Sequence, residues 1–167
     1  MGPDMQLYPI DDAEALFISP AIDDWSPVHA RRIACVIDLE GEVDHGVPSV
    51  PGHMLYVYFP IYDEDLPDLA RLDAVCSLGA RLLESGHKVL SHCGMGFNRS
   101  ALVAGLILVQ RGMSGAEAVA RIRERRPGAL FNETFERYLL SLPAGRNAGS
   151  APWVAPTTNG RGAEAPE

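Results

Sequence analysis

Short apolar runs of strand length alternate along this chain with longer segments of helical periodicity. The runs predict strands over residues 15–20, 32–39, 54–61 and 88–92, and a helical turn is expected from Asp24. Between the third and fourth runs, small and apolar residues recur at a spacing of three and four. They predict one face of a helix that stops at Gly86. The residues on that face are Leu69, Leu72, Cys76, Gly79 and Leu83.

The segment after the fourth run predicts three more helices. Residues 101–110, ALVAGLILVQ, are apolar on every side, which is typical of a buried central helix, here ending near Gly112. Ser114 and Glu117 have the spacing of a capping box, and Asn132 can cap the last helix. Strands that alternate with helices indicate an α/β fold, a single domain with a mostly parallel central sheet flanked by helices. In such sheets ligands bind beyond the carboxyl ends of the strands.

Composition divides the chain near Pro143. The 167 residues are 47% hydrophobic, which suits one domain with a sizeable core. From Pro143 onward the chain is rich in Pro, Gly and Ala and has no periodicity. Residues 1–142 are therefore predicted to fold, and residues 143–167 to form a disordered tail. Trp153 is interpreted as a stray aromatic in that tail rather than a docking point.

Charge and cysteine content argue against several classes of protein. A net charge of −8 argues against a nucleic-acid or anionic-membrane binder, so a phosphate site would need a local positive charge. No apolar stretch reaches the roughly 18 residues of a membrane span, and the acidic N-terminus does not resemble a signal peptide. A cytoplasmic location is expected. Cys35, Cys76 and Cys93 are odd in number and lack metal-ligand spacing, which argues against both a disulfide framework and a zinc site.

The candidate chemistry lies in SHCGMGFNRSAL, residues 91–102, where a predicted strand leads into the buried helix. Cys93 falls at the helix N-terminus, where unpaired N–H groups, the helix dipole and a nearby cation favour a thiolate. Gly94 and Gly96 allow the backbone to curl so that its amides surround an anion. Arg99 adds a planar fork that can bind two phosphate oxygens at once. The loop can therefore hold both a nucleophile and the phosphorus that it attacks.

His92-Cys93, then five residues, then Arg99-Ser100 resembles the phosphate-binding loop of the cysteine-dependent protein tyrosine phosphatases. The downstream RSALVAGLILVQRGMSGAEAVARIRERRP and NETFERYLLSL are similar to the small dual-specificity branch, over about Leu16 to Leu142. The resemblance implies a phosphorylated protein or peptide as substrate, without metal or cofactor. It also implies that the Ser100 hydroxyl helps the sulfur leave and that His92 supports the loop and favours the thiolate. The residues expected to bind the substrate are Gly94, Met95, Gly96, Phe97, Asn98 and Arg99.

The family's mechanism needs a general acid on a loop upstream of the nucleophile. In YVYFPIYDEDLPDL, Asp63 follows a predicted strand, thirty residues before Cys93, and holds the place of the acid. Asp65 is the nearest alternative, and either carboxylate could instead favour the dipole of a helix starting at Leu66. In the implied reaction Cys93 attacks phosphorus while Asp63 protonates the leaving oxygen. Water activated by Asp63 then hydrolyses the phosphocysteine.

The same loop is compatible with three other functions, which the sequence favours less. The segment Gly96–Arg99 also resembles the loop of RNA 5′-triphosphatases. The acidic net charge argues against an RNA substrate, because binding a polyanion needs many Lys and Arg contacts. Phosphoinositide phosphatases tend to carry Lys within the loop, and this loop has none. A non-catalytic phosphate-binding module would typically lack the cysteine or another loop residue. The sequence therefore predicts a phosphatase for phosphotyrosine and also for phosphoserine and phosphothreonine.

The remaining candidates have simpler interpretations. Cys35 could form a disulfide with Cys93 on oxidation, as neighbouring cysteines do in some relatives, but a buried strand cysteine is favoured. Four arginines near the end of the fourth predicted helix could steer acidic substrates, although a solvated helix face is favoured. They are Arg121, Arg123, Arg125 and Arg126.

Overall fold

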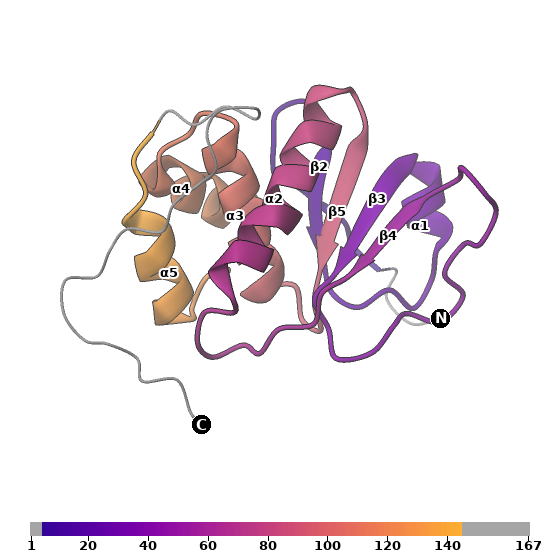
Figure 1. Ribbon diagram of the computed structural model, residues 1–167, viewed down its shortest axis with the longest axis horizontal. Helices are drawn as coiled ribbons and strands as arrows, with labels where there is room; N and C mark the ends of the chain where they lie inside the picture. Colours follow the sequence, from indigo (N-terminus) through magenta and orange to yellow (C-terminus); the bar gives the residue numbers. More distant parts are fainter. Residues whose placement is uncertain (1–4, 145–167) are drawn as a thin grey trace.

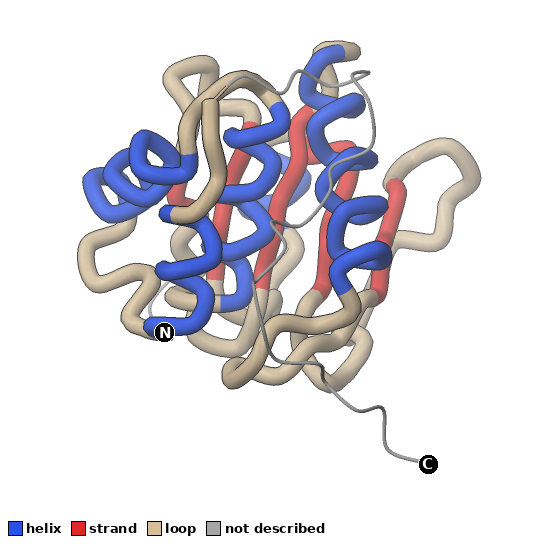
Figure 2. The backbone as a smooth tube through the Cα atoms, turned by 60° about the vertical axis from the view of Figure 1, so that its left-hand side comes forward, coloured by secondary structure: helices blue, strands red, loops and turns tan. Residues whose placement is uncertain are grey.

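The computed structural model describes residues 5–144, so Trp153 and nearly all of the predicted tail lie outside the described residues. Helices pack against a central five-stranded sheet (Figures 1 and 2). The strands are β1 (Tyr8–Pro9), β2 (Leu16–Ser19), β3 (Ile33–Asp38), β4 (Leu55–Tyr58) and β5 (Lys88–His92). The helices are α1 (Ser26–Ala30), α2 (Leu69–Glu84), α3 (Arg99–Gln110), α4 (Gly115–Arg125) and α5 (Glu133–Leu140). The predicted α/β fold class is confirmed.

The order of the strands places the candidate loop at the middle of one sheet edge. The order is β1-β2-β5-β3-β4, and every neighbouring pair is parallel except β1 with β2. The short antiparallel strand β1 was not predicted, because two residues carry no periodicity. His92, the last residue of β5, pairs with Ser19 of β2 and with Asp38 of β3. The carboxyl ends of three parallel strands therefore meet where Cys93 follows β5.

Alternation along the strands separates two apolar clusters on opposite faces of the sheet. Leu16 and Ile18 of β2 belong to the larger cluster, which includes side chains of α2 and α3, whereas Phe17 belongs to the smaller one, with Val28 of α1. This follows from the period of two in a strand. Both faces of the sheet are thus covered, which explains why β2 and β3 are apolar with little interruption.

The caps predicted at Ser114 and Asn132 are confirmed, and the predicted apolar face from Leu69 to Leu83 lies within α2. Ser114 accepts from the Glu117 N–H (3.1 Å) and Asn132 from the Phe135 N–H (3.2 Å), as expected of N-caps. Helix α2 begins at Leu69 rather than Leu66, and its cap is Asp68, which accepts from the Arg71 N–H (2.8 Å). Asp63 and Asp65 therefore lie outside the first turn of that helix. Within residues 5–144, no helix is both long enough and apolar enough to span a membrane.

Two buried thiols predict a loss of stability in alkaline solution. Burial raises the pKa of Cys35 to about 12, and burial together with Asp73 raises the pKa of Cys76 as well. In the unfolded chain a thiol ionises near pH 8.5, so above that pH the unfolded state binds fewer protons than the folded state. The free energy of unfolding should then fall by about 1.4 kcal/mol per pH unit for each thiol. Urea unfolding between pH 8 and pH 10.5 measures the slope.

The matched control for this prediction is a double variant, Cys35→Ala with Cys76→Ala. It should be less stable at neutral pH, because it creates cavities in the core. Its stability should nevertheless depend on pH less steeply above pH 8.5 than that of the unsubstituted chain. An identical slope in both proteins would contradict the assignment of the effect to these thiols.

Candidate active site

The loop between β5 and α3 is anchored from outside through its carbonyl groups. The Gly94 carbonyl accepts from Ala21 N (3.2 Å) and the Phe97 carbonyl from Leu130 N (2.9 Å). The Met95 and Gly96 carbonyls accept from Arg126, at 3.3 and 3.2 Å. No acceptor among the described residues pairs with the backbone N–H groups of Gly94, Met95, Phe97 and Asn98. Because a peptide's N–H and C=O point in opposite directions, this arrangement leaves a ring of donors for an anion.

Gly96 is required by the loop's backbone. Its φ is +72°, and a Cβ atom there would lie 2.8 Å from Pro20 N and from the carbonyl carbon of Ser19. These neighbours are backbone atoms just after β2, which cannot move aside cheaply. A side chain at this position would therefore both strain the conformation and displace the loop.

The candidate nucleophile lies at the bottom of this loop. The Cys93 side chain is buried, and its Sγ accepts from the Gly96 N–H at 3.3 Å. Ser100 Oγ lies 3.4 Å from the same sulfur, at the start of α3. The N–H group, the hydroxyl and the helix N-terminus together suit a negatively charged sulfur.

Arg99 is held above the sheet edge by three groups. Its Nη1 donates to the carbonyls of Ile61 (3.2 Å) and Leu39 (3.4 Å), and its Nη2 pairs with Glu40 Oε2 at 3.1 Å. The Gly41 N–H, together with Arg99, holds the pKa of Glu40 below its ordinary value. Sequence reasoning missed Glu40, because its position just after β3 has no local signal. The ion pair with Glu40 orients the Arg99 guanidinium for a planar, bidentate contact with phosphate.

Asp63, and not Asp65, is hydrogen-bonded to residues 93–99, the loop between β5 and α3 that we call the phosphate loop. Asp63 Oδ2 accepts from Asn98 Nδ2 at 2.9 Å. No hydrogen bond joins Asp65 to residues 93–99 within the part of the chain that the structure describes; Asp65 lines a cavity with Leu66 and Pro67. The geometry therefore supports the sequence's choice of Asp63 as the candidate acid.

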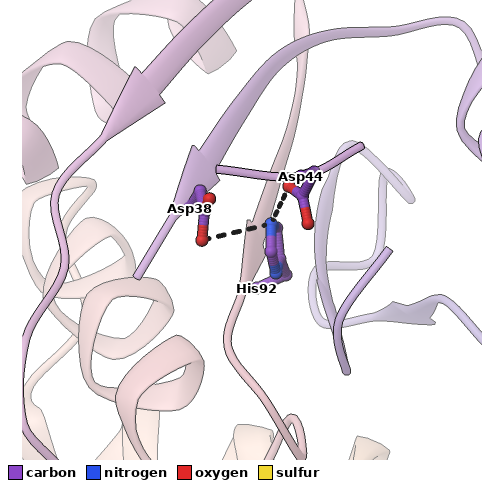
Figure 3. Close-up of side chains that lie close together, drawn as sticks. All are labelled: Asp38, Asp44 and His92. Atoms are coloured by element: carbon purple, nitrogen blue, oxygen red, sulfur yellow. Dashed lines mark hydrogen bonds and ion pairs between the residues drawn. The ribbon is translucent and has the colours of Figure 1, made fainter. Parts of the chain in front are cut away.

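His92, which precedes the candidate nucleophile in the chain, lies in a polar cluster with Asp38 and Asp44 (Figure 3). Its Nε2 lies 2.6 Å from Asp44 Oδ2 and 3.5 Å from Asp38 Oδ1, and the Tyr56 hydroxyl donates to Asp38 at 2.5 Å. Burial raises the pKa of Asp38, and burial with the Asp38 hydrogen bond raises the pKa of Tyr56. Sequence reasoning missed these partners, which come from β3, β4 and the loop between them.

The same cluster is the one group among the described residues with a metal-ligand arrangement. One ligand atom each from Asp38, Asp44 and His92 lies within 4.8 Å of the others. Hydrogen bonds to His92 and Tyr56 already explain the positions of both carboxylates. We therefore interpret the cluster as a set of hydrogen bonds that fixes His92 and, with it, the backbone that leads to Cys93.

Asp44→Ala is expected to lower both stability and activity. The Asp44 side chain is 6% exposed, and its loss leaves the buried His92 Nε2–H without its nearest acceptor, at a cost of about 1–3 kcal/mol. Asp44→Asn keeps an acceptor oxygen and should recover most of the loss. Thermal unfolding and kcat on p-nitrophenyl phosphate measure the two effects. Glu42→Ala, an exposed change in the same loop, is the control, and an equal effect of Glu42→Ala would contradict the prediction.

Arg126 supports the loop, which corrects the expectation of a solvated arginine face. Its guanidinium lies over the rings of Tyr8 (4.2 Å) and Phe97 (3.9 Å) while it donates to two loop carbonyls. The other three arginines near it form ion pairs at the surface: Arg121 and Arg125 with Asp12, and Arg123 with Glu136.

The strand register argues against a disulfide between Cys35 and Cys93. Cys35 pairs with Val89, and Cys93 comes four residues later. At about 3.3 Å per residue, the two cysteines are separated by about 13 Å along the sheet. A disulfide needs Cα atoms within about 7 Å. Cys35 is buried in the core, as the favoured interpretation expected.

Two exposed apolar side chains lie on or beside the loop. Met95 and Phe131 are 70% and 67% exposed, and the Phe131 ring lies 6.0 Å from that of Phe97. Met95 belongs to the loop, and Phe131 belongs to the segment just before α5. They offer contact to an aromatic substrate group.

A sulfur, a guanidinium and a carboxylic acid around an anion-binding loop, on this fold, define the class of cysteine-dependent phosphatases. A family model described as "Dual specificity phosphatase, catalytic domain" matches residues 21–143. The chain therefore belongs to the dual-specificity phosphatase family.

Solved structures agree with this assignment. Human DUSP28 is 26% identical with a TM-score of 0.66, over 80% of this chain and 89% of that chain. Tk-PTP in its active form is 25% identical with a TM-score of 0.62, over 84% and 95%. The human tyrosine phosphatase-like serine/threonine/tyrosine-interacting protein is 25% identical with a TM-score of 0.64, over 80% and 92%.

Proposed function

We propose that this chain is an active phosphatase that hydrolyses phosphotyrosine, and also phosphoserine and phosphothreonine, in proteins or peptides. The observation that carries the proposal is the loop's hydrogen-bond pattern. The carbonyls of Gly94, Met95, Gly96 and Phe97 are occupied by the surrounding protein, and within residues 5–144 the N–H groups of Gly94, Met95, Phe97 and Asn98 have no acceptor. Cys93, Arg99 and Asp63 lie around this loop. These groups are what transfer of a phosphoryl group through a cysteine requires.

In the proposed reaction the Cys93 thiolate attacks phosphorus and a sulfur–phosphorus bond forms. The bond from phosphorus to the substrate oxygen breaks, and Asp63 gives that oxygen its proton. The Asp63 carboxylate then takes a proton from water, which attacks phosphorus and releases Cys93, with Ser100 stabilising the departing sulfur. Arg99 and the free N–H groups hold the phosphoryl oxygens in both steps.

The surroundings of the loop support a peptide substrate over a polyanion. Glu40 and Glu64 lie beside the candidate site, and the charge of the whole chain is −8. Exposed Met95 and Phe131 instead suit a phosphotyrosine ring, a contact worth about 1 kcal/mol or roughly fivefold in affinity. We further propose that residues 1–142 are sufficient for this activity.

We expect turnover of phosphotyrosine and phosphothreonine peptides, with phosphotyrosine preferred. The measurement is kcat/KM on matched peptides of one sequence, with phosphoinositides and triphosphate-ended RNA assayed alongside. Turnover of phosphotyrosine alone would restrict the protein to tyrosine. Activity confined to phosphoinositides or RNA would overturn the peptide substrate, and binding without any turnover would indicate a non-catalytic module.

A further inference from the structure

Both oxygens of the candidate acid accept hydrogen bonds from side-chain amides. Asn98 Nδ2 donates to Asp63 Oδ2 at 2.9 Å, and Asn132 Nδ2 donates to Asp63 Oδ1 at 2.8 Å. Asn98 belongs to the phosphate loop and is almost fully buried, whereas Asn132 is the N-cap of α5. Asp63 is therefore held between two elements that are distant from it in the sequence.

Backbone donors determine which way each amide faces. Asn98 Oδ1 accepts from the Asn132 N–H (2.9 Å), and Asn132 Oδ1 accepts from the Phe135 N–H (3.2 Å). A backbone N–H can only donate, so the amide oxygen must face it and the NH₂ group must point away. In both residues the NH₂ group consequently points at Asp63.

The contact extends to the backbone of the acid's own loop. Asn132 Nδ2 also lies 3.1 Å from the Glu64 carbonyl, next to Asp63. The phosphate loop is tied to the same region by the hydrogen bond from Leu130 N to the Phe97 carbonyl. The candidate acid, the phosphate loop and the start of α5 thus form one hydrogen-bonded unit.

We propose that Asn98 and Asn132 are positioning residues for the general acid, a role that rests on the proposed phosphatase function. Each Asp63 oxygen gives one lone pair to an amide and keeps capacity for the proton that it delivers to the leaving oxygen. The two donors fix the carboxyl plane relative to Arg99 and Cys93. Without these amide donors the Asp63 carboxyl group would be misplaced as a proton donor, while the nucleophile and the phosphate contacts would stay intact.

Two substitutions separate this role from folding. Asn98→Ala removes one donor to Asp63. Asn132→Ser keeps a hydroxyl that can cap α5 but removes the amide donor, so it tests the role even where Asn98→Ala folds poorly. Glu133→Gln, at the exposed neighbouring position on α5, is the matched control.

The readout is the dependence of kcat on the leaving group. A general acid matters for the phenol of phosphotyrosine and matters little for p-nitrophenol, which leaves as a stable anion. Asn132→Ser should lower kcat on a phosphotyrosine peptide by about 10²-fold, with little change in KM and little loss on p-nitrophenyl phosphate. Asn98→Ala also removes the acceptor of the Asn132 N–H in the loop, so it should lower kcat on both substrates, and more on the phosphotyrosine peptide. In an Asp63→Asn background, Asn132→Ser should cause no further loss of kcat on the phosphotyrosine peptide. Glu133→Gln should match the unsubstituted enzyme.

The outcomes distinguish this proposal from the function on which it rests. Equal losses on both substrates, or full additivity with Asp63→Asn, would overturn the positioning role alone. Turnover of neither substrate by the unsubstituted chain would overturn the proposed function, and this role with it.

Discussion

Cys93→Ser is expected to abolish turnover, by on the order of 10⁴-fold or more, while binding of phosphate esters persists. The serine hydroxyl keeps its proton at neutral pH and is a far weaker nucleophile than a thiolate. The groups proposed to hold the phosphate are unchanged, because the free N–H groups and Arg99 do not depend on the sulfur for their positions. Steady-state kinetics measure the first effect, and calorimetric titration with a phosphotyrosine peptide measures the second.

The control for this variant is Cys76→Ala, which removes a thiol packed between α2 and α3. It should cost stability but retain kcat, because among the described residues the Cys76 thiol is hydrogen-bonded to the Val103 carbonyl and not to residues 93–99. Rapid acid quenching should also trap phosphate on the unsubstituted enzyme and none on Cys93→Ser. Appreciable turnover by Cys93→Ser would contradict a mechanism in which Cys93 is the nucleophile.

Asp63→Asn is expected to lower kcat on a phosphotyrosine peptide by roughly 10²–10⁴-fold, the range contributed by general acid catalysis. Asparagine has nearly the same shape and can still accept one amide hydrogen bond, but it cannot give a proton to the leaving oxygen. On p-nitrophenyl phosphate the loss should be much smaller, because that leaving group needs no proton. The ratio of kcat on the two substrates is the measurement.

Asp65→Asn is the matched control, two residues away in the same acidic segment. It should leave the ratio of the two kcat values unchanged, because Asp65 faces the cavity lined by Leu66 and Pro67. If Asp65→Asn changes the ratio and Asp63→Asn does not, the acid is assigned to the wrong residue.

The sequence alone determined the fold class and the identity of the loop. The short apolar runs of β2 and β3, the apolar run of α3 and the caps at Ser114 and Asn132 are local signals, decided by residues a few positions apart. The candidate nucleophile and phosphate-binding arginine could be predicted for the same reason. Cys93 and Arg99 are six residues apart, so a single local conformation brings them together.

Only the tertiary structure decided how the loop is supported. Glu40 reaches Arg99 from the end of β3, Asp44 and Tyr56 reach His92 and its partner Asp38, and Arg126 reaches two loop carbonyls. These pairs are separated by 18 to 59 positions, and an isolated Glu, Asp or Arg has no periodicity that reveals its partner. The contact depends on strand order and register, which place the carboxyl ends of β2, β5 and β3 side by side. The chemistry could therefore be predicted from one short segment, whereas its orientation came from residues that only the packing of the sheet brings together.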